Sequence, residues 1–185
     1  MLTDPDIAEI VRGPRGMMRG IDSCVHQQCL MSAITLIYST IDALSALTRP
    51  LDQPDTKSNI FVAWVDKYLL PESRLSCSSE DLYGARCGIL HNYGLDSAMR
   101  RQGRAKALVY RWREGPFPDP QHRARIPADA ITICVEDLHE ALNTAVENFL
   151  IQIGTDVALK SRIDRHRKDL LCYRPWSAVK IRVAA

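Results

Sequence analysis

Arg86 and His91 are the side chains of this sequence whose types and spacing best suit chemistry on a phosphodiester. An arginine keeps its charge at neutral pH and a histidine exchanges a proton there, so the two can bind a phosphate and transfer protons. They lie within the stretch Ser78 to Gly94. On an ideal helix of ~3.6 residues per turn, positions five apart are separated by about 140°. We therefore expect the pair to meet around one phosphate only if the helix loosens toward Gly94 or if two protomers each contribute.

The stretch that carries this pair is predicted to be a helix. Ser78, with Asp81 three positions later, forms a capping box that pairs side chains with free backbone N–H groups at the helix start. Gly94 suits a left-handed C-cap at the other end. Arg86 shares one side of the predicted helix with Leu82 and Ile89, and Leu90 lies near the edge of that side.

The most strongly predicted helix lies earlier in the chain. Asp22 or Ser23 can cap its start, and Arg49-Pro50 ends it. A helix that is apolar on two faces is expected to be buried on two faces, at the centre of a bundle or where two copies meet. The two mainly apolar rows are Leu30, Ile34, Ile37, Ile41 and Leu44, and Ala33, Leu36, Thr40, Ala43 and Leu47.

Asp42 is the polar exception on this buried helix. A carboxylate there needs a cationic or hydrogen-bonding partner. Asp42 could also lie at a solvent-filled seam or bond to Tyr38 one turn earlier. Arg86 could form a purely structural ion pair with Asp42 or Glu80, and the dipole of its helix could stabilise His91.

The remainder of the chain is predicted to complete one mainly α domain spanning residues 1–185. Residues 1–21 are expected to be an N-terminal arm with one short helix, and residues 57–70 and 127–153 to be helices of the bundle. Thr155 should cap a last basic helix that ends at about Leu170, and residues 171–185 should be a tail.

Residues 99–127 differ from the helical remainder and are predicted to be a basic β-hairpin insertion. Ala105 to Trp112 has strand character, a proline-rich loop follows, and His122 to Ile126 could return as a second strand. Tyr110 and Trp112 alternate with arginines and could stack on bases, or could pack within the hairpin. The predicted nucleic-acid-binding residues are Arg100, Arg101, Arg104, Arg111 and Arg113.

Charge is unevenly distributed along the chain, although its net value is only +2. Residues 99–125 and 160–185 are predominantly basic, and the remainder is predominantly acidic. This asymmetry fits a polyanionic partner such as RNA. A solvated basic face, or contacts between acidic and basic surfaces of two protomers, would explain it equally well.

The cysteines and the apolar segments point to a cytoplasmic protein without a cofactor. The six cysteines are scattered, and the acidic start has no apolar run of the kind found in signal peptides, so we expect reduced thiols. The longest apolar segment, 30–47, is interrupted by polar residues, so no membrane span is expected. Cys24, His26 and Cys29 are spaced in a metal-like way, but a plain helix is the favoured interpretation, and no metal is expected.

The run Arg86-Cys-Gly-Ile-Leu-His91 resembles the signature of the HEPN family, in which an arginine and a histidine are separated by four to six residues at the end of a bundle helix. Asn92 and Tyr93 follow the motif, and the long preceding helix carries Tyr38 and Asp42. The resemblance implies a HEPN-like bundle of four to five helices, into which the hairpin is inserted. Cys87 stands where the family commonly has a polar residue, often asparagine.

The resemblance also implies an activity and an assembly. Many family members are homodimeric, metal-independent endoribonucleases, often toxins or defence proteins, whose two motifs line a shared cleft. Arg86 would hold the phosphate and stabilise the transition state, His91 would act on the ribose 2′-hydroxyl or the leaving oxygen, and Asp42 would orient one of them. Tyr38, Asn92 and Tyr93 would support this site. RNA, an antitoxin or a nucleotidyltransferase-type protein would be the partners.

Two other functions fit the same sequence. One is a non-catalytic helical dimerisation module that binds nucleic acid, a nucleotide or a protein partner. The other is a purely structural, all-helical subunit. Cleavage of RNA in the presence of EDTA separates both of these from the ribonuclease hypothesis.

Overall fold

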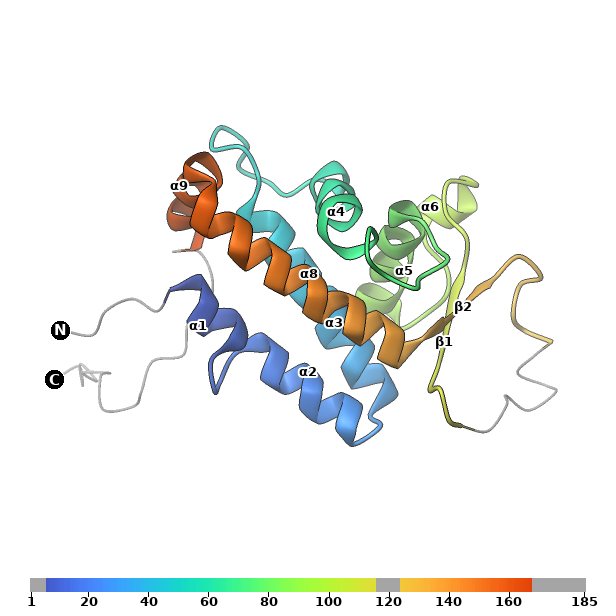
Figure 1. Ribbon diagram of the computed structural model, residues 1–185. Coiled ribbons are helices and arrows are strands. Elements are labelled where there is room, and N and C mark those ends of the chain that lie inside the picture. The colour runs from blue at the N-terminus through green and yellow to red at the C-terminus, as the bar shows by residue number, and fades with distance from the viewer. Residues whose placement is uncertain (1–5, 116–123, 168–185) are drawn as a thin grey trace, which may run out of the picture.

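The computed structural model describes residues 6–115 and 124–167, and its regular elements are mainly helices (Figure 1). The predicted tail, 171–185, falls outside the described residues. So do residues 122 and 123, with which the predicted return strand 122–126 begins. Two helices, α3 (Leu30–Leu47) and α8 (Val135–Thr155), lie next to each other at the centre. The mainly α class is therefore confirmed.

The central helices bury most of their apolar side chains. On α3, Ile34, Ile37, Ile41 and Leu44 of the first predicted row are at most 2% exposed, whereas Leu36 of the second row is 38% exposed. On α8 one face is buried along the whole length of the helix, through Val135, Leu138, Leu142, Val146, Phe149 and Ile153. Removing such faces from water is the main driving force for packing these helices.

The predicted long helix starting at Asp22 or Ser23 is instead two helices. Helix α2 spans Met17–His26, and α3 begins only at Leu30. Gln28 between them has a φ of 53°, a left-handed conformation that ends one helix and turns the chain back. The turn lets α2 pack against both α3 and α8, which one continuous helix could not do.

The segment expected to be an N-terminal arm, residues 1–21, contains a packed helix in its described part. Helix α1 spans Ile7–Arg12 and is capped by the side chain of Asp6. Ile7 and Val11 belong to the same buried cluster as the central helices. The Arg12 guanidinium also donates to the backbone carbonyl oxygen of Asn143 on α8, at 2.8 Å.

Helix α4 (Ser58–Trp64) continues as one π-helical turn, η1 (Val65–Leu69), close to the predicted range. Helix α5 (Ser79–Asn92) follows, and its Ser78–Asp81 capping box is present as predicted. The left-handed C-cap residue is Tyr93, with φ 50°, and not Gly94. The Gly94 N–H instead bonds to the Gly88 carbonyl and folds the next segment back onto α5.

The β-hairpin prediction is wrong. Strand β1 (Leu108–Arg111) pairs with β2 (Ile131–Cys134), and the two strands are parallel. The second strand comes from residues that were expected to start the long helix, so α8 begins at Val135 and not at Pro127. Ile131 and Ile133 alternate with Thr132, a β-branched period-two pattern that favours a strand.

Two further helices complete the described chain. Helix α6 (Ala98–Arg101) is a single turn beside α5, within the region expected to be the hairpin. Helix α9 (Val157–His166) forms in the predicted region, and its predicted end at about Leu170 lies outside the described residues. Its cap is Asp156 and not Thr155, because the Asp156 carboxylate accepts from the Leu159 N–H at 2.9 Å.

Among the described residues, α3 alone is long and apolar enough to span a membrane by length and composition. Half of this helix is buried inside the fold, as in the core helix of a globular protein.

Glycines on α5 allow the close approach of the segment that follows it. A Cβ at Gly88 would overlap the Gly94 carbonyl oxygen and lie 3.0 Å from that of Asp96. A Cβ at Gly84 would lie 2.9 Å from the Cβ of Ala105. Residues 94–105 can therefore pack directly on α5 only because these side chains are absent.

We predict that Gly88→Ala lowers the free energy of unfolding by about 1–3 kcal/mol, because the carbonyl groups it meets are backbone and must shift. Chemical denaturation measures this change. Gly154→Ala is the matched control, because a Cβ there meets nothing within 4 Å and helix propensity favours alanine by about 1 kcal/mol. Equal stability of the two variants would contradict the proposed tight contact.

Candidate functional site

Asp42 and Arg86 form an ion pair that joins α3 to α5. The Arg86 Nε donates to Asp42 Oδ2 at 2.6 Å, and Nη2 lies 2.5 Å from the same oxygen. Their side chains are about one-quarter exposed, at 23% and 25%. Partial burial acts to lower the pKa of Arg86, but the hydrogen bond and charge of Asp42 outweigh it and raise the pKa. The guanidinium is therefore held as a fixed cation at the edge of the core.

His91 lies beside the free end of the same guanidinium. Arg86 Nη1 is 3.5 Å from His91 Nε2 within one chain. The expectation that the helix must loosen, or that a second protomer must contribute, is thus wrong, because α5 stays helical through Asn92. The Arg86 side chain is long and flexible enough to reach His91, although the two residues point in different directions from the helix axis.

The resulting row of Asp42, Arg86 and His91 can bind an anion and transfer a proton. Asp42 occupies one side of the guanidinium, and His91, which is exposed, lies at the other. Arg86 Nη1 also approaches Cys87 Sγ, at 4.0 Å. A phosphate at the exposed end would meet a fixed positive charge and a titratable ring together.

Of the residues expected to support this site, Tyr38 is instead part of the buried core. Tyr38 is fully buried and its hydroxyl pairs with that of Tyr110 on β1, at 2.5 Å, so it does not bond to Asp42. Burial is the largest cause that raises the pKa of Tyr38, which keeps the hydroxyl protonated. Tyr93 is 69% exposed at the end of α5, and Asn92 is the last residue of that helix.

The five arginines predicted to bind nucleic acid are divided between two pockets and two ion pairs. Arg100 and Arg104 line one pocket and Arg111 lines another. Arg101 is paired with Asp96, and Arg113 forms a 2.7 Å ion pair with Asp137. Tyr110 packs inward against Tyr38, edge to face, so it is not a stacking platform.

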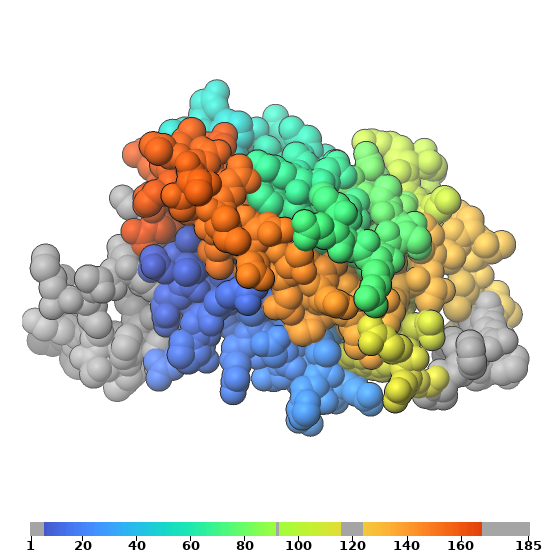
Figure 2. Space-filling model, in the orientation of Figure 1, coloured from blue at the N-terminus to red at the C-terminus, as the bar shows by residue number. Residues whose placement is uncertain are grey.

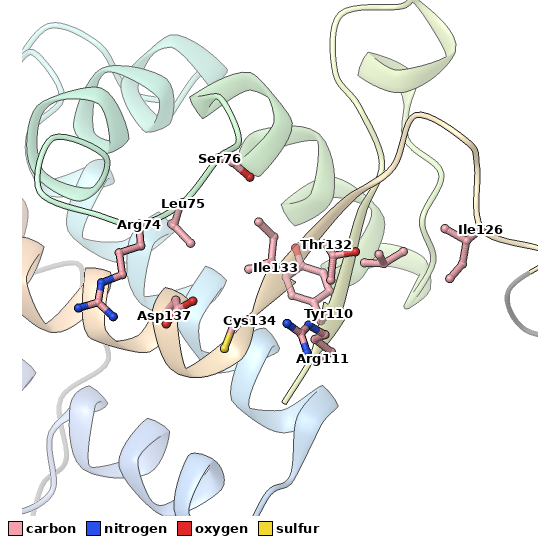
Figure 3. Close-up of a pocket in the computed structure, with 11 residues that line it drawn as sticks. Arg74, Leu75, Ser76, Tyr110, Arg111, Ile126, Thr132, Ile133, Cys134 and Asp137 are labelled. Atoms are coloured by element: carbon pink, nitrogen blue, oxygen red, sulfur yellow. The ribbon is translucent and has the colours of Figure 1, made fainter. Parts of the chain in front are cut away.

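Two pockets formed by described residues were not predicted from the sequence. One, of about 690 Å³, lies beside the two strands (Figure 3). The other, of about 670 Å³, lies between α6 and the start of α5. Neither is lined by Asp42, Arg86 or His91. Both depend on strand β2, whose period-two pattern is the signal that could have located them.

Two further histidines have structural partners. His139 on α8 lies 2.8 Å from Asp22 on α2, and His166 is buried 3.2 Å from the Arg49 carbonyl oxygen. In the part of the chain that the structure describes, no three His, Cys, Asp or Glu side chains gather as a metal site would require.

The fold and this row define a mainly helical protein with a small parallel sheet and a charged, histidine-containing surface site. In comparisons with protein-family models, curated proteins and solved structures, nothing matches this chain. Any more specific assignment therefore depends on the chemistry of its own residues.

We predict that Tyr38→Phe and Tyr110→Phe each lower the free energy of unfolding by about 1–3 kcal/mol, because each leaves one buried hydroxyl without its partner. The double variant should cost clearly less than the sum of the two, since it leaves no such hydroxyl. Denaturant titration of all four proteins measures this coupling. Additive losses would show that the hydroxyl pair does not stabilise the fold.

Proposed function

We propose that this protein is a metal-independent endoribonuclease of HEPN type, with the row Asp42, Arg86 and His91 as its catalytic site. The observation that carries the proposal is the 3.5 Å approach of Arg86 Nη1 to His91 Nε2, with Asp42 bonded to the other side of the guanidinium. A cation and an acid–base group on one exposed edge are the minimum that cleavage of RNA by its own 2′-hydroxyl requires.

In this mechanism the RNA supplies its own nucleophile. His91 takes the proton of the 2′-hydroxyl as that oxygen attacks the adjacent phosphorus, while water protonates the leaving 5′-oxygen. In the alternative, His91 gives a proton to the leaving 5′-oxygen and water accepts the proton of the 2′-hydroxyl. Arg86 stabilises the charge on the pentavalent phosphorane. The P–O5′ bond breaks, and the products are a 2′,3′-cyclic phosphate and a free 5′-hydroxyl. Asp42 does not contact the reacting 2′- or 5′-oxygen and acts as a positioning residue for Arg86.

The biological setting that goes with this proposal is a cytoplasmic homodimer acting on RNA in a toxin or defence role. An antitoxin or nucleotidyltransferase-type protein would be its partner. Because Arg86 and His91 meet within one chain, a dimer would widen the RNA-binding surface without being needed to assemble the pair.

A second candidate is a helical module that binds nucleic acid, a nucleotide or a protein without cleaving RNA. One observation favours it: the two described pockets, which could hold a ligand, are lined by neither Arg86 nor His91. Cys87, in place of the polar residue common at this position in the HEPN family, points the same way.

We expect the wild-type protein to cleave single-stranded RNA in excess EDTA and His91→Ala to be slower by about 10²–10⁴-fold, the usual contribution of a general acid or base. Gel analysis with end-group identification measures the rate and the cyclic phosphate. His26→Ala is the matched control, because this exposed histidine ends α2 and lies outside the site. Undiminished cleavage by His91→Ala would refute the proposal, and RNA binding without cleavage by any variant would favour the second candidate.

Asp42→Ala should reduce kcat on the order of tenfold and leave KM nearly unchanged, because it frees the guanidinium without removing it. Asp42→Asn, which keeps an acceptor oxygen, should retain more activity than Asp42→Ala. Steady-state kinetics on protein shown by circular dichroism to be folded distinguishes positioning from loss of structure. Full activity in folded Asp42→Ala would exclude a positioning role.

A further inference from the structure

The larger pocket lies where three distant parts of the chain meet: residues 74–76, the two strands, and the start of α8. Figure 2 shows the segment around residues 70–80 (green) and α8 (orange) lying side by side at the surface. The pocket is separate from the proposed catalytic row. Its volume of about 690 Å³ is within the range of about 300–1,000 Å³ typical of small-molecule sites.

Two arginines bring positive charge to this pocket from different elements. Arg74 precedes α5 and Arg111 ends β1, and both side chains line the pocket (Figure 3). Within residues 6–115 and 124–167, the side chain of neither arginine forms an ion pair or a hydrogen bond, and both residues are exposed. Guanidinium groups in this state are available to an oxoanion, which their planar forks bind in a bidentate manner.

The carboxylate in the pocket does not cancel this charge. Asp137 lines the pocket, but it is bonded to Arg113 at 2.7 Å, so its charge is already compensated. Cys134 is also neutral, because burial, the largest cause, and its hydrogen bond to Glu136 raise the pKa of the thiol. Arg74 and Arg111 therefore determine the sign of the charge that an incoming ligand meets.

The remaining walls are mainly apolar. Leu75, Val109, Ile126 and Ile133 line the pocket, with the hydroxyl group of Thr132 among them. A bare inorganic anion would leave these walls in contact with water. A ligand that combines an anionic group with an apolar body would cover them and gain the free energy of burying that surface.

We propose that this pocket binds a small organic oxoanion, a phosphate monoester or carboxylate carried on an apolar body. Arg74 and Arg111 lie at opposite sides of the pocket, with Asp137 and Cys134 between them (Figure 3), so each offers its own position for the anionic group, and the body lies against the apolar walls beside β2. The proposal is independent of the ribonuclease proposal, because the two sites share no residue.

The test is isothermal titration of the full chain with 1-naphthyl phosphate and 1-naphthoate, which carry the two oxoanions on one apolar ring system. We expect at least one probe to bind saturably with one-to-one stoichiometry, and the comparison identifies the preferred oxoanion. Neutral 1-naphthalenemethanol should bind at least tenfold more weakly. Of Arg74→Gln and Arg111→Gln, the variant that removes the arginine bound to the anionic group should weaken the better probe at least tenfold, and the other should have the smaller effect.

Two further variants complete the experiment. Arg104→Gln is the matched control, because this exposed arginine lines only the other pocket, and it should bind like the wild type. Thr132→Phe places a ring in the pocket from an exposed strand position and should abolish binding without disturbing the core. Absence of saturable binding of either probe, equal binding of the neutral probe, or equal weakening by Arg104→Gln would overturn the proposal.

Discussion

The ion pair between Asp42 and Arg86 is the constraint on which the site depends. Each charge is partly removed from water, so burying either one without the other would cost free energy of folding. The pair fixes the register of α5 against the central helix α3 and holds the guanidinium at the core edge. This fixed orientation directs the remaining amino group of Arg86 toward His91. The same contact therefore supports the packing of two helices and the geometry of the proposed chemistry, so its contributions to stability and to function have to be measured separately.

The surroundings of α5 are arranged by small residues and by one buried carboxylate. Gly84 and Gly88 let the following segment pack directly on the helix. Asp81 accepts from the Ser78 N–H in the capping box and, with its other oxygen, from the Lys106 N–H at 2.6 Å. That second bond anchors the chain just before β1. The capping box thus serves both the start of the helix and the position of the sheet, and through the sheet the pocket beside it.

Much of the fold was predictable because it follows from periodicity. The buried rows of α3 and α8 repeat at helical spacing, and Ser78 and Asp81 form a local signal that tertiary contacts did not override. The failures have physical causes of a different kind. The turn at Gln28 uses a left-handed residue that is not glycine, and the pairing of β1 with β2 is a contact between distant segments that local pattern does not encode. For the site, the residue types were predictable, but the distance between Arg86 and His91 was not, because a helical wheel describes backbone directions and not the reach of a flexible side chain.

The contact between Arg86 and His91 within one chain changes what a dimer would contribute to the site. When the sequence alone is considered, either a loosened end of the helix or a second copy is needed to bring the arginine and the histidine to one phosphate. When the pair meets within one chain, each protomer carries a complete set of proposed catalytic groups. The site nonetheless lies at an exposed edge, since His91 is exposed, and such an edge binds a flexible polyanion weakly without further contacts. A second protomer placed over this edge would add charge and exclude water, which strengthens electrostatic stabilisation. Dimerisation would then affect substrate affinity and rate, while the identity of the reacting groups would stay within each chain.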